Sequence, residues 1–158
     1  MSAVLSEKSA LHSEMYEHSY YDWLMLQARL LREGKLTDAD IAHIAEELED
    51  MGNEIEAALV SYFRQAIVHL CKLGFVHAPD TVKHWRSEIA NFRAEIDERV
   101  VNRFTNEDKI TAIFNRAWKS ARATLQATLT PEEFKRIPDE CPFSMGQVRD
   151  PLFFPNQR

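Results

Sequence analysis

The stretch TDADIAHIAEELEDMGNEIEAALVSYFRQAIVHLCKLG, residues 37–74, decides the fold. Its apolar residues recur every three or four positions, which is the period of an α-helix, and they keep one phase past Gly52. Thr37 or Asp38 is suited to cap the start of this helix, and Gly74 is suited to cap its end. The pattern therefore predicts a single helix of about 35 residues.

Further helical segments lie on both sides of this stretch. Residues 16–33 show the same period and end at Gly34, a glycine in the C-terminal capping position. A third helix is expected to open near Pro79 and run to about residue 104, and a fourth to start at Asn106. Residues 130–133, Thr-Pro-Glu-Glu, combine a capping box with a proline at the first helical position, which predicts a short fifth helix.

These segments predict an all-α protein: an antiparallel up-down bundle of four main helices, a short fifth helix and an extended C-terminal tail. A chain of 158 residues fits one domain, so we expect residues 1–158 to form a single helical-bundle domain. Within it, residues 1–14 are expected to be a frayed lead-in and residues 138–158 a tail docked on the bundle.

Composition and motifs restrict the classes of function. The net charge of −6 argues against nucleic acid or anionic lipid as partners, because both require a basic surface. No leader pattern and no long apolar run is present, so we expect a cytoplasmic protein without a membrane partner. Hydrolase, phosphate-loop and zinc motifs are missing, and the spacing of Cys71 and Cys141 fits no metal or disulfide framework. We expect no cofactor and assign no catalytic residue.

The segment between Asp38 and Glu56 is strongly acidic, with eight carboxylates and His43 as the one basic group. It admits three interpretations: a solvated helix face, a surface for a protein partner, or a metal site. The interaction candidates are Glu46, Glu47, Asp50 and Glu54.

The metal candidates in this segment are Asp40, His43 and Glu47, which share one flank of the predicted helix. Asp40 and His43 have the three-residue interval that di-metal bundles use in their glutamate and histidine ligands. A second unit of this kind is missing, and this flank is expected to point sideways or outward rather than into the core.

Three polar residues fall on predicted apolar faces and are candidates for a structural role: Gln27, His69 and Arg93. Arg93 lies about 40° from Ile89 around its helix, where an unpaired guanidinium would be costly. We expect it to pair with a carboxylate, either from residues 46–50 or from Glu88 or Glu95.

Several runs of residues together resemble a known family. They are Tyr16–Trp23, Gln27–Gly34, Ile41–Gly52, His69-Leu70, Trp85-Arg86 with Arg93, Ala117–Arg122 and Cys141–Gln147. The combination is similar to the bacterial family called domain of unknown function 29 (DUF29), over about residues 16–155. The resemblance implies an all-helical bundle and brings no assigned activity and no catalytic residues.

For function, the sequence favours a non-enzymatic cytoplasmic interaction or adaptor module with an acidic helix surface. Its partner would be a protein, and a basic protein would be steered to the acids. Self-association would be a two-fold homodimer. The alternative is a metal-binding protein or metal-dependent enzyme of the helical-bundle type.

Overall fold

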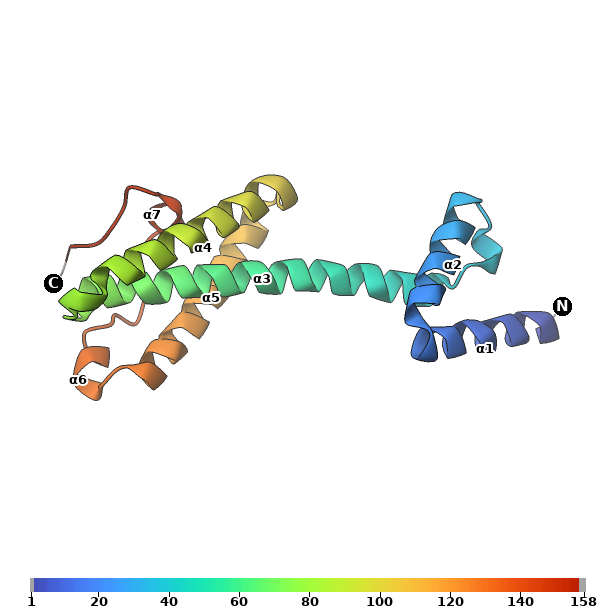
Figure 1. The fold of residues 1–158 in the computed structure, drawn as a ribbon, viewed down its shortest axis with the longest axis horizontal. Coiled ribbons are helices and arrows are strands. Elements are labelled where there is room, and N and C mark those ends of the chain that lie inside the picture. Colours follow the sequence, from blue (N-terminus) through green and yellow to red (C-terminus); the bar gives the residue numbers. More distant parts are fainter. Residues whose placement is uncertain (1, 157–158) are drawn as a thin grey trace. The chain divides into compact units, whose positions relative to one another are not determined.

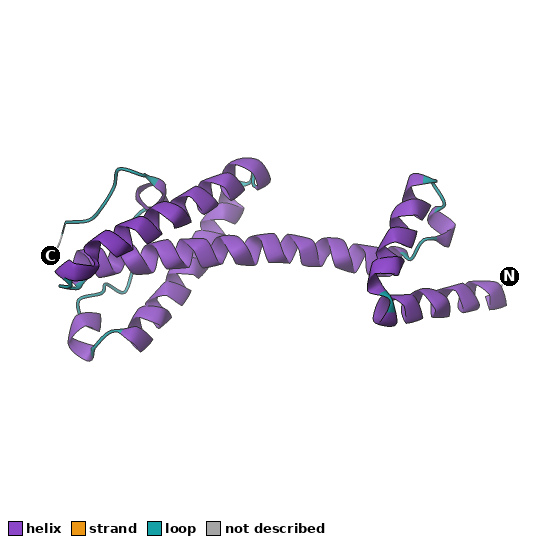
Figure 2. Ribbon diagram, in the orientation of Figure 1, coloured by secondary structure: helices purple, strands orange, loops and turns teal. Residues whose placement is uncertain are grey.

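The computed structural model describes the backbone of residues 2–156 and the side chains of residues 10–100 and 103–156. Helices, turns and loops make up this part of the chain, so the all-α prediction is confirmed (Figure 2). None of the helices there is both long and apolar enough to cross a membrane. The elements are α1 (Ser2–His18), α2 (Tyr20–Arg32), η1 (Leu36–Asp38), α3 (Ile41–Phe75), η2 (Pro79–Thr81), α4 (Val82–Arg103), α5 (Glu107–Thr128), α6 (Pro131–Phe134) and α7 (Met145–Arg149), where η marks a 3-10 helix.

The long helix α3 has 35 residues and continues past Gly52, as the sequence predicted. The prediction of its N-terminal cap was wrong, because Thr37 and Asp38 belong to the preceding 3-10 helix. Asp40 caps α3 instead: its Oδ1 accepts a hydrogen bond of 3.5 Å from the backbone N–H of His43.

The single helix predicted over residues 16–33 is two helices in the structure, α1 and α2, and helix begins well before Tyr16. Ser19 separates them with a non-helical backbone (φ −143°, ψ 51°). The apolar period runs through Ser19, so periodicity alone could not locate the break. The predicted end is confirmed, because Gly34 has φ +69° and the next N–H bonds back to Leu30 O at 2.9 Å, a glycine-ended C-cap.

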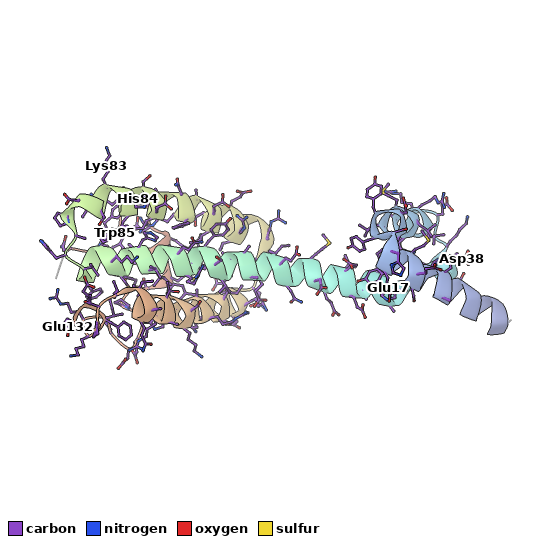
Figure 3. The ribbon with its side chains drawn as sticks, turned by 60° about the horizontal axis from the view of Figure 1, so that its bottom comes forward. Glu17, Asp38, Lys83, His84, Trp85 and Glu132 are labelled. Carbon is purple, nitrogen blue, oxygen red and sulfur yellow. The ribbon has the colours of Figure 1, made fainter. Side chains whose placement is uncertain are left out.

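The chain divides into two compact units, residues up to Asn53 and residues from Glu54 onward, here called the N-terminal and C-terminal units. In the C-terminal unit, α4 and α5 lie beside the second part of α3 around one hydrophobic core (Figure 1). Lys83 lies on the outer side of α4 (Figure 3), whereas Trp85 is only 9% exposed. The most deeply buried core residues are Leu59, Phe63, Ala66, Ile67, Leu70, Cys71, Ile89, Ile96, Ile113, Ala117, Ala121, Leu125 and Val148.

The starts of the later helices agree with the sequence. The side chain of Asn106 caps α5, and Thr130 and Glu133 form the predicted capping box around α6. The tail after Pro138 was expected to be extended throughout, but it contains α7, whose own capping box joins Ser144 and Gln147. Val148 in this short helix is fully buried.

The N-terminal unit is packed very differently. Among its described side chains, only those of Trp23 and Gln27 are buried. The predicted inward stripe of α3 is largely uncovered here, with Leu48 64% and Met51 58% exposed. The unit is therefore held together by a few specific contacts rather than by a hydrophobic core.

Candidate functional site

The contacts that organise the N-terminal unit form a group of aromatic, acidic and imidazole side chains, here called the N-terminal cluster. It joins residues from α1, α2 and the first turns of α3. Its members are Tyr16, Tyr20, Trp23, Asp40, His43 and Glu47.

Glu47 is bound by two tyrosines. The hydroxyl of Tyr16 donates to Glu47 Oε1 at 2.6 Å, and the hydroxyl of Tyr20 donates to Oε2. These bonds favour the charged carboxylate, and they hold the pKa of Glu47 below its ordinary value. The same bond to Glu47 raises the pKa of Tyr16 to about 12, because it stabilises the protonated phenol. The first part of α3 is thereby tied to α1 and α2.

Asp40 joins the other half of the cluster. Its Oδ2 lies 2.7 Å from His43 Nδ1 and accepts a hydrogen bond of 3.4 Å from Trp23 Nε1. Partial burial opposes the charge on Asp40, but the bonds from His43 and Trp23 hold the pKa of its carboxyl below the ordinary value. The backbone N–H of Asp40 donates to Gln27 Oε1 at 2.9 Å, so the buried amide secures the start of α3.

Ring stacking completes the cluster. Tyr16 stacks on His43 with ring centroids 4.2 Å apart, and it meets the edge of Trp23 at 4.9 Å. The flank of α3 that carries Asp40, His43 and Glu47 was expected to point sideways or outward. In the structure it faces the aromatic residues of α1 and α2, and the apolar stripe next to it is the exposed one.

The three metal candidates are only partly brought together. Asp40 and His43 bond to each other, whereas both carboxylate oxygens of Glu47 accept hydrogen bonds from tyrosines. In the part of the chain that the structure describes, no group of three or more His, Cys, Asp or Glu side chains is arranged to hold a metal ion.

Large apolar side chains are exposed around this cluster. Among the described residues, Leu152 is the one exposed large hydrophobic outside the N-terminal unit. The others are Leu11, Tyr20, Tyr21, Leu24, Met25, Leu31, Leu36, Ile41, Leu48 and Met51. Single exposed apolar side chains are normal, whereas larger apolar patches are typical of surfaces that bind another molecule.

The interaction candidates differ in their surroundings. Glu46 and Asp50 in the N-terminal unit and Glu54 in the C-terminal unit are exposed, and none of them forms an ion pair with a described residue. Glu47 belongs to the N-terminal cluster. The acidic surface is therefore carried by the first three, together with Glu49, which is also exposed.

A groove of about 630 Å³ lies between α1 and α2. It combines thioether and aliphatic side chains with two exposed arginines, Arg29 and Arg32, which form no ion pair with a described residue. The residues that line it are Met15, Asp22, Met25, Leu26, Arg29 and Arg32.

The C-terminal unit holds the remaining polar candidates. Arg93 is 3% exposed, but its predicted carboxylate partner was wrong: its hydrogen bonds go to the backbone carbonyls of Val148 at 2.7 Å, Gln147 at 3.2 Å and Phe153 at 2.8 Å. Its guanidinium also lies over the ring of Phe154. His69 is half-buried and donates from Nδ1 to the carbonyl of Gln65 in its own helix.

Comparison with protein families identifies the chain. The sequence profile of the domain of unknown function DUF29 matches residues 15–154. The chain belongs to the DUF29 family. The match spans the N-terminal cluster and the tail that Arg93 holds, so both features of this DUF29 protein lie within the family domain. Searches of curated proteins and of solved structures found no match.

Sequence reasoning singled out the polar side of the N-terminal cluster but missed its aromatic side. Tyr16, Tyr20 and Trp23 were not among the candidate residues, and nothing in the sequence paired them with acids. The signal available was the acidic run of α3 following closely after a segment rich in tyrosine and tryptophan.

Proposed function

We propose that this DUF29 protein is a non-enzymatic interaction module whose N-terminal unit binds a protein through its exposed apolar side chains. The observation that carries the proposal is the contrast within the chain. Among the described side chains, the C-terminal unit exposes one large hydrophobic residue, Leu152, whereas the N-terminal unit exposes ten. A small unit with little core of its own gains stability when a partner covers such a surface.

The charge of the N-terminal unit favours a specific protein partner over nonspecific hydrophobic association. The acids Glu46, Glu49 and Asp50 are exposed on the same turns of α3 as Leu48 and Met51, but on the other side of the helix, so this unit carries an acidic face as well as an apolar one. A basic or mixed partner would be steered to it, and association would weaken as salt rises. We place the protein in the cytoplasm and propose no nucleic acid or membrane partner.

The test is site-specific photo-crosslinking in host cells, with a crosslinking amino acid at Leu48 and, as the matched control, at Leu152. Both side chains are exposed, 64% and 88% respectively, but they belong to different units. We expect one protein to crosslink stoichiometrically from position 48 and not from position 152. Identical products at both positions, or none at position 48, would contradict the proposal.

A second candidate function is metal binding or metal-dependent catalysis. The contact between Asp40 and His43 Nδ1 favours it, because a carboxylate that holds one ring nitrogen of a histidine orients the other toward a metal. Metal analysis of the protein purified without chelators tests this candidate. A stoichiometric transition metal that is lost in His43→Ala supports it, and the same metal content in His43→Ala and His77→Ala excludes His43 as its ligand.

The up-down four-helix arrangement also stays a proposal. It requires α2 and the first part of α3 to belong to the same packed bundle as α4 and α5. Amide hydrogen exchange distinguishes it from two separately stabilised units: a single bundle would protect α2 and α4 to a similar degree, whereas separate units would leave α2 less protected than α4.

A further inference from the structure

We propose that the C-terminal unit binds a small aromatic carboxylate in a pocket between the end of α3 and the tail. The pocket has a volume of about 270 Å³ and is here called the tail pocket. It is lined by four phenylalanines, Phe75, Phe143, Phe153 and Phe154. Because the site lies in the C-terminal unit, this inference does not depend on the proposed protein partner of the N-terminal unit.

The tail returns to the end of α3 to form this pocket (Figure 1). Pro155 lies beside Gly74, so that a Cβ at position 74 would be 3.4 Å from the Cβ of Pro155. A larger residue at position 74 would take up part of the space between them. Cavities of about 150 Å³ are known to hold benzene. The tail pocket therefore has room for an aromatic ring that carries a carboxylate.

The walls of the tail pocket are held in place by contacts within the C-terminal unit. Phe143 and Phe153 meet edge to face, with ring centroids 5.8 Å apart. Arg93 donates hydrogen bonds to the backbone carbonyls of Gln147 and Phe153, and its guanidinium lies over the ring of Phe154. A preformed aromatic wall favours a planar ring as ligand, because little ordering is required on binding.

The polar groups of the lining favour a ligand with acceptor oxygens. Gln147 Oε1 accepts a hydrogen bond of 3.0 Å from the N–H of Ser144, whereas Nε2 of Gln147 has no hydrogen-bond partner among the described residues. Asn156, the second polar residue of the lining, can donate as well. No charged residue lines the tail pocket, so no acid there would repel a carboxylate.

Two guanidiniums lie against one wall of the tail pocket. Arg86 and Arg93 contact the ring of Phe154, at 4.7 and 5.1 Å from its centroid, and neither forms an ion pair with a described residue. Nη1 of Arg93 is buried and has no hydrogen-bond partner in the described part of the chain. A buried donor of this kind on a charged group is costly, and a nearby anion would offset the charge.

The acids near Arg93 compensate this charge only in part. The carboxylates that act on Arg93 are those of Asp97 and Asp150. Asp97 already accepts a hydrogen bond of 2.8 Å from Arg149 Nε. Together with Arg86, three guanidiniums therefore stand against two carboxylates beside the tail pocket. This balance favours an anionic ligand over a neutral or cationic one.

The first experiment titrates the isotope-labelled full chain with benzoate, benzamide and benzylamine and follows backbone amide resonances by NMR. We expect benzoate to bind with a dissociation constant below about 1 mM, more tightly than benzamide, and benzylamine to bind most weakly. The shifts should centre on Phe75, Gln147 and Phe154. Benzoate that does not bind, or that binds no more tightly than benzamide or benzylamine, would overturn the proposal. So would shifts confined to Arg29 and Arg32 in the N-terminal unit.

Arg86 provides the test of charge, because its guanidinium is exposed. Arg86→Met should weaken benzoate binding by about threefold or more and leave benzamide binding unchanged, whereas Arg86→Lys should keep most of the affinity for benzoate. The control is Lys119→Met, which removes an exposed cation that lines a different groove of the same unit. An equal loss in Arg86→Met and Lys119→Met would contradict the assigned site.

Gly74 provides the test of space. Gly74→Val should weaken the binding of benzoate and benzamide alike, because its side chain would take up part of the tail pocket. Gly52→Val is the control, since it adds the same side chain to α3 where nothing lies within 4 Å of the new Cβ. Circular dichroism verifies that both variants fold. A folded Gly74→Val protein that binds benzoate as the wild type does would refute the tail pocket, and if this variant does not fold, the Arg86 variants decide.

Discussion

At the scale of single residues, Arg93 shows how a buried guanidinium can be hydrogen-bonded without a direct salt bridge. Three carbonyl oxygens from the tail accept its hydrogen bonds, and both Arg93 and Arg86 contact the ring of Phe154, at 5.1 and 4.7 Å from its centroid. Burial lowers the pKa of Arg93, while Asp150 and Asp97 oppose that shift. The hydrogen bonds of this guanidinium therefore hold the tail against α4.

We predict that Arg93→Met lowers the free energy of unfolding by about 3 kcal/mol, because three carbonyls lose a charged donor at once. Urea denaturation measures this value. The matched control is Arg86→Met, which removes an exposed guanidinium from the other contact with Phe154 and should change the stability by less than about 0.5 kcal/mol. Equal effects of the two substitutions would mean that the carbonyl bonds contribute nothing.

A second prediction at this scale concerns Tyr16. Its bond to Glu47 raises the pKa of the phenol to about 12, from an ordinary 10.0. The stabilisation from this raised pKa is complete below pH 10 and is lost as the pH rises toward 12. Glu47→Gln should lower the pKa of Tyr16 toward its ordinary value. Phenolate absorbance, taken as the difference from Tyr16→Phe, measures it, and a pKa that Glu47→Gln leaves unchanged would contradict the assigned bond.

Low pH affects the same hydrogen bond by protonating its acceptor, the carboxylate of Glu47. The pKa of Glu47 is lowered from an ordinary 4.5, so its contribution is present above that pH and is lost as the pH falls through the lowered value. The protection factors of the amides in the first turns of α3, which correct for the intrinsic pH dependence of hydrogen exchange, should therefore fall in acid, and less so in Glu47→Gln. An identical acid dependence in both proteins would count against this linkage.

At the scale of elements, α3 depends on local chemistry at its start. Asp40 accepts the bond from the N–H of His43, and Gln27 accepts the bond from the N–H of Asp40. Two of the amide groups at this helix start are thus satisfied by side chains. Farther along, α7 is held by the capping box of Ser144 and Gln147 and by the burial of Val148, which explains how five residues stay helical.

We predict that Asp40→Ala lowers the stability of the first turns of α3 by about 1 kcal/mol, the usual value of an N-cap. Asp40→Asn keeps an acceptor for the amide and should lose much less. Amide hydrogen exchange at Ile44 and its neighbours reports the change directly. If asparagine costs as much as alanine, the charge shared with His43 matters more than the cap.

At the scale of the whole molecule, the two units differ in how they are stabilised. The C-terminal unit has a continuous core to which α3, α4, α5 and the tail all contribute. The N-terminal unit relies on the N-terminal cluster and, in our proposal, on a protein partner. A structure built in this way should open locally before it unfolds as a whole.

We predict two unfolding transitions that single tryptophans can resolve. Trp23 lies in the N-terminal unit, and Trp85 and Trp118 lie in the C-terminal unit. In Trp85→Phe with Trp118→Phe, the fluorescence of Trp23 should change at a lower urea concentration than the fluorescence of Trp118 does in Trp23→Phe. Coincident transitions would contradict the two-unit description.

The sequence by itself determined the helices of this protein, because helix period, caps and breakers act over a few neighbouring residues. It predicted the 35 residues of α3, the cap at Asn106, the capping box of α6 and the turn at Gly34. It also located Arg93 and Gln27 on buried faces. The sequence did not locate the helix break at Ser19 or the helix cap at Asp40, because neighbouring residues could also have served as caps.

Only the tertiary structure decided which partners these residues have. Glu47 meets two tyrosines that lie 27 and 31 positions away in sequence, and Arg93 meets carbonyls 54 to 60 positions away. Every residue type has a backbone carbonyl, so the sequence cannot show which carbonyl will accept a hydrogen bond. It therefore suggested a carboxylate partner for Arg93, whereas the fold provides backbone carbonyls. Periodicity shows that the stripe of Leu48 and Met51 is apolar. Whether that stripe is covered depends on which helices pack against it, and in the N-terminal unit both side chains stay exposed.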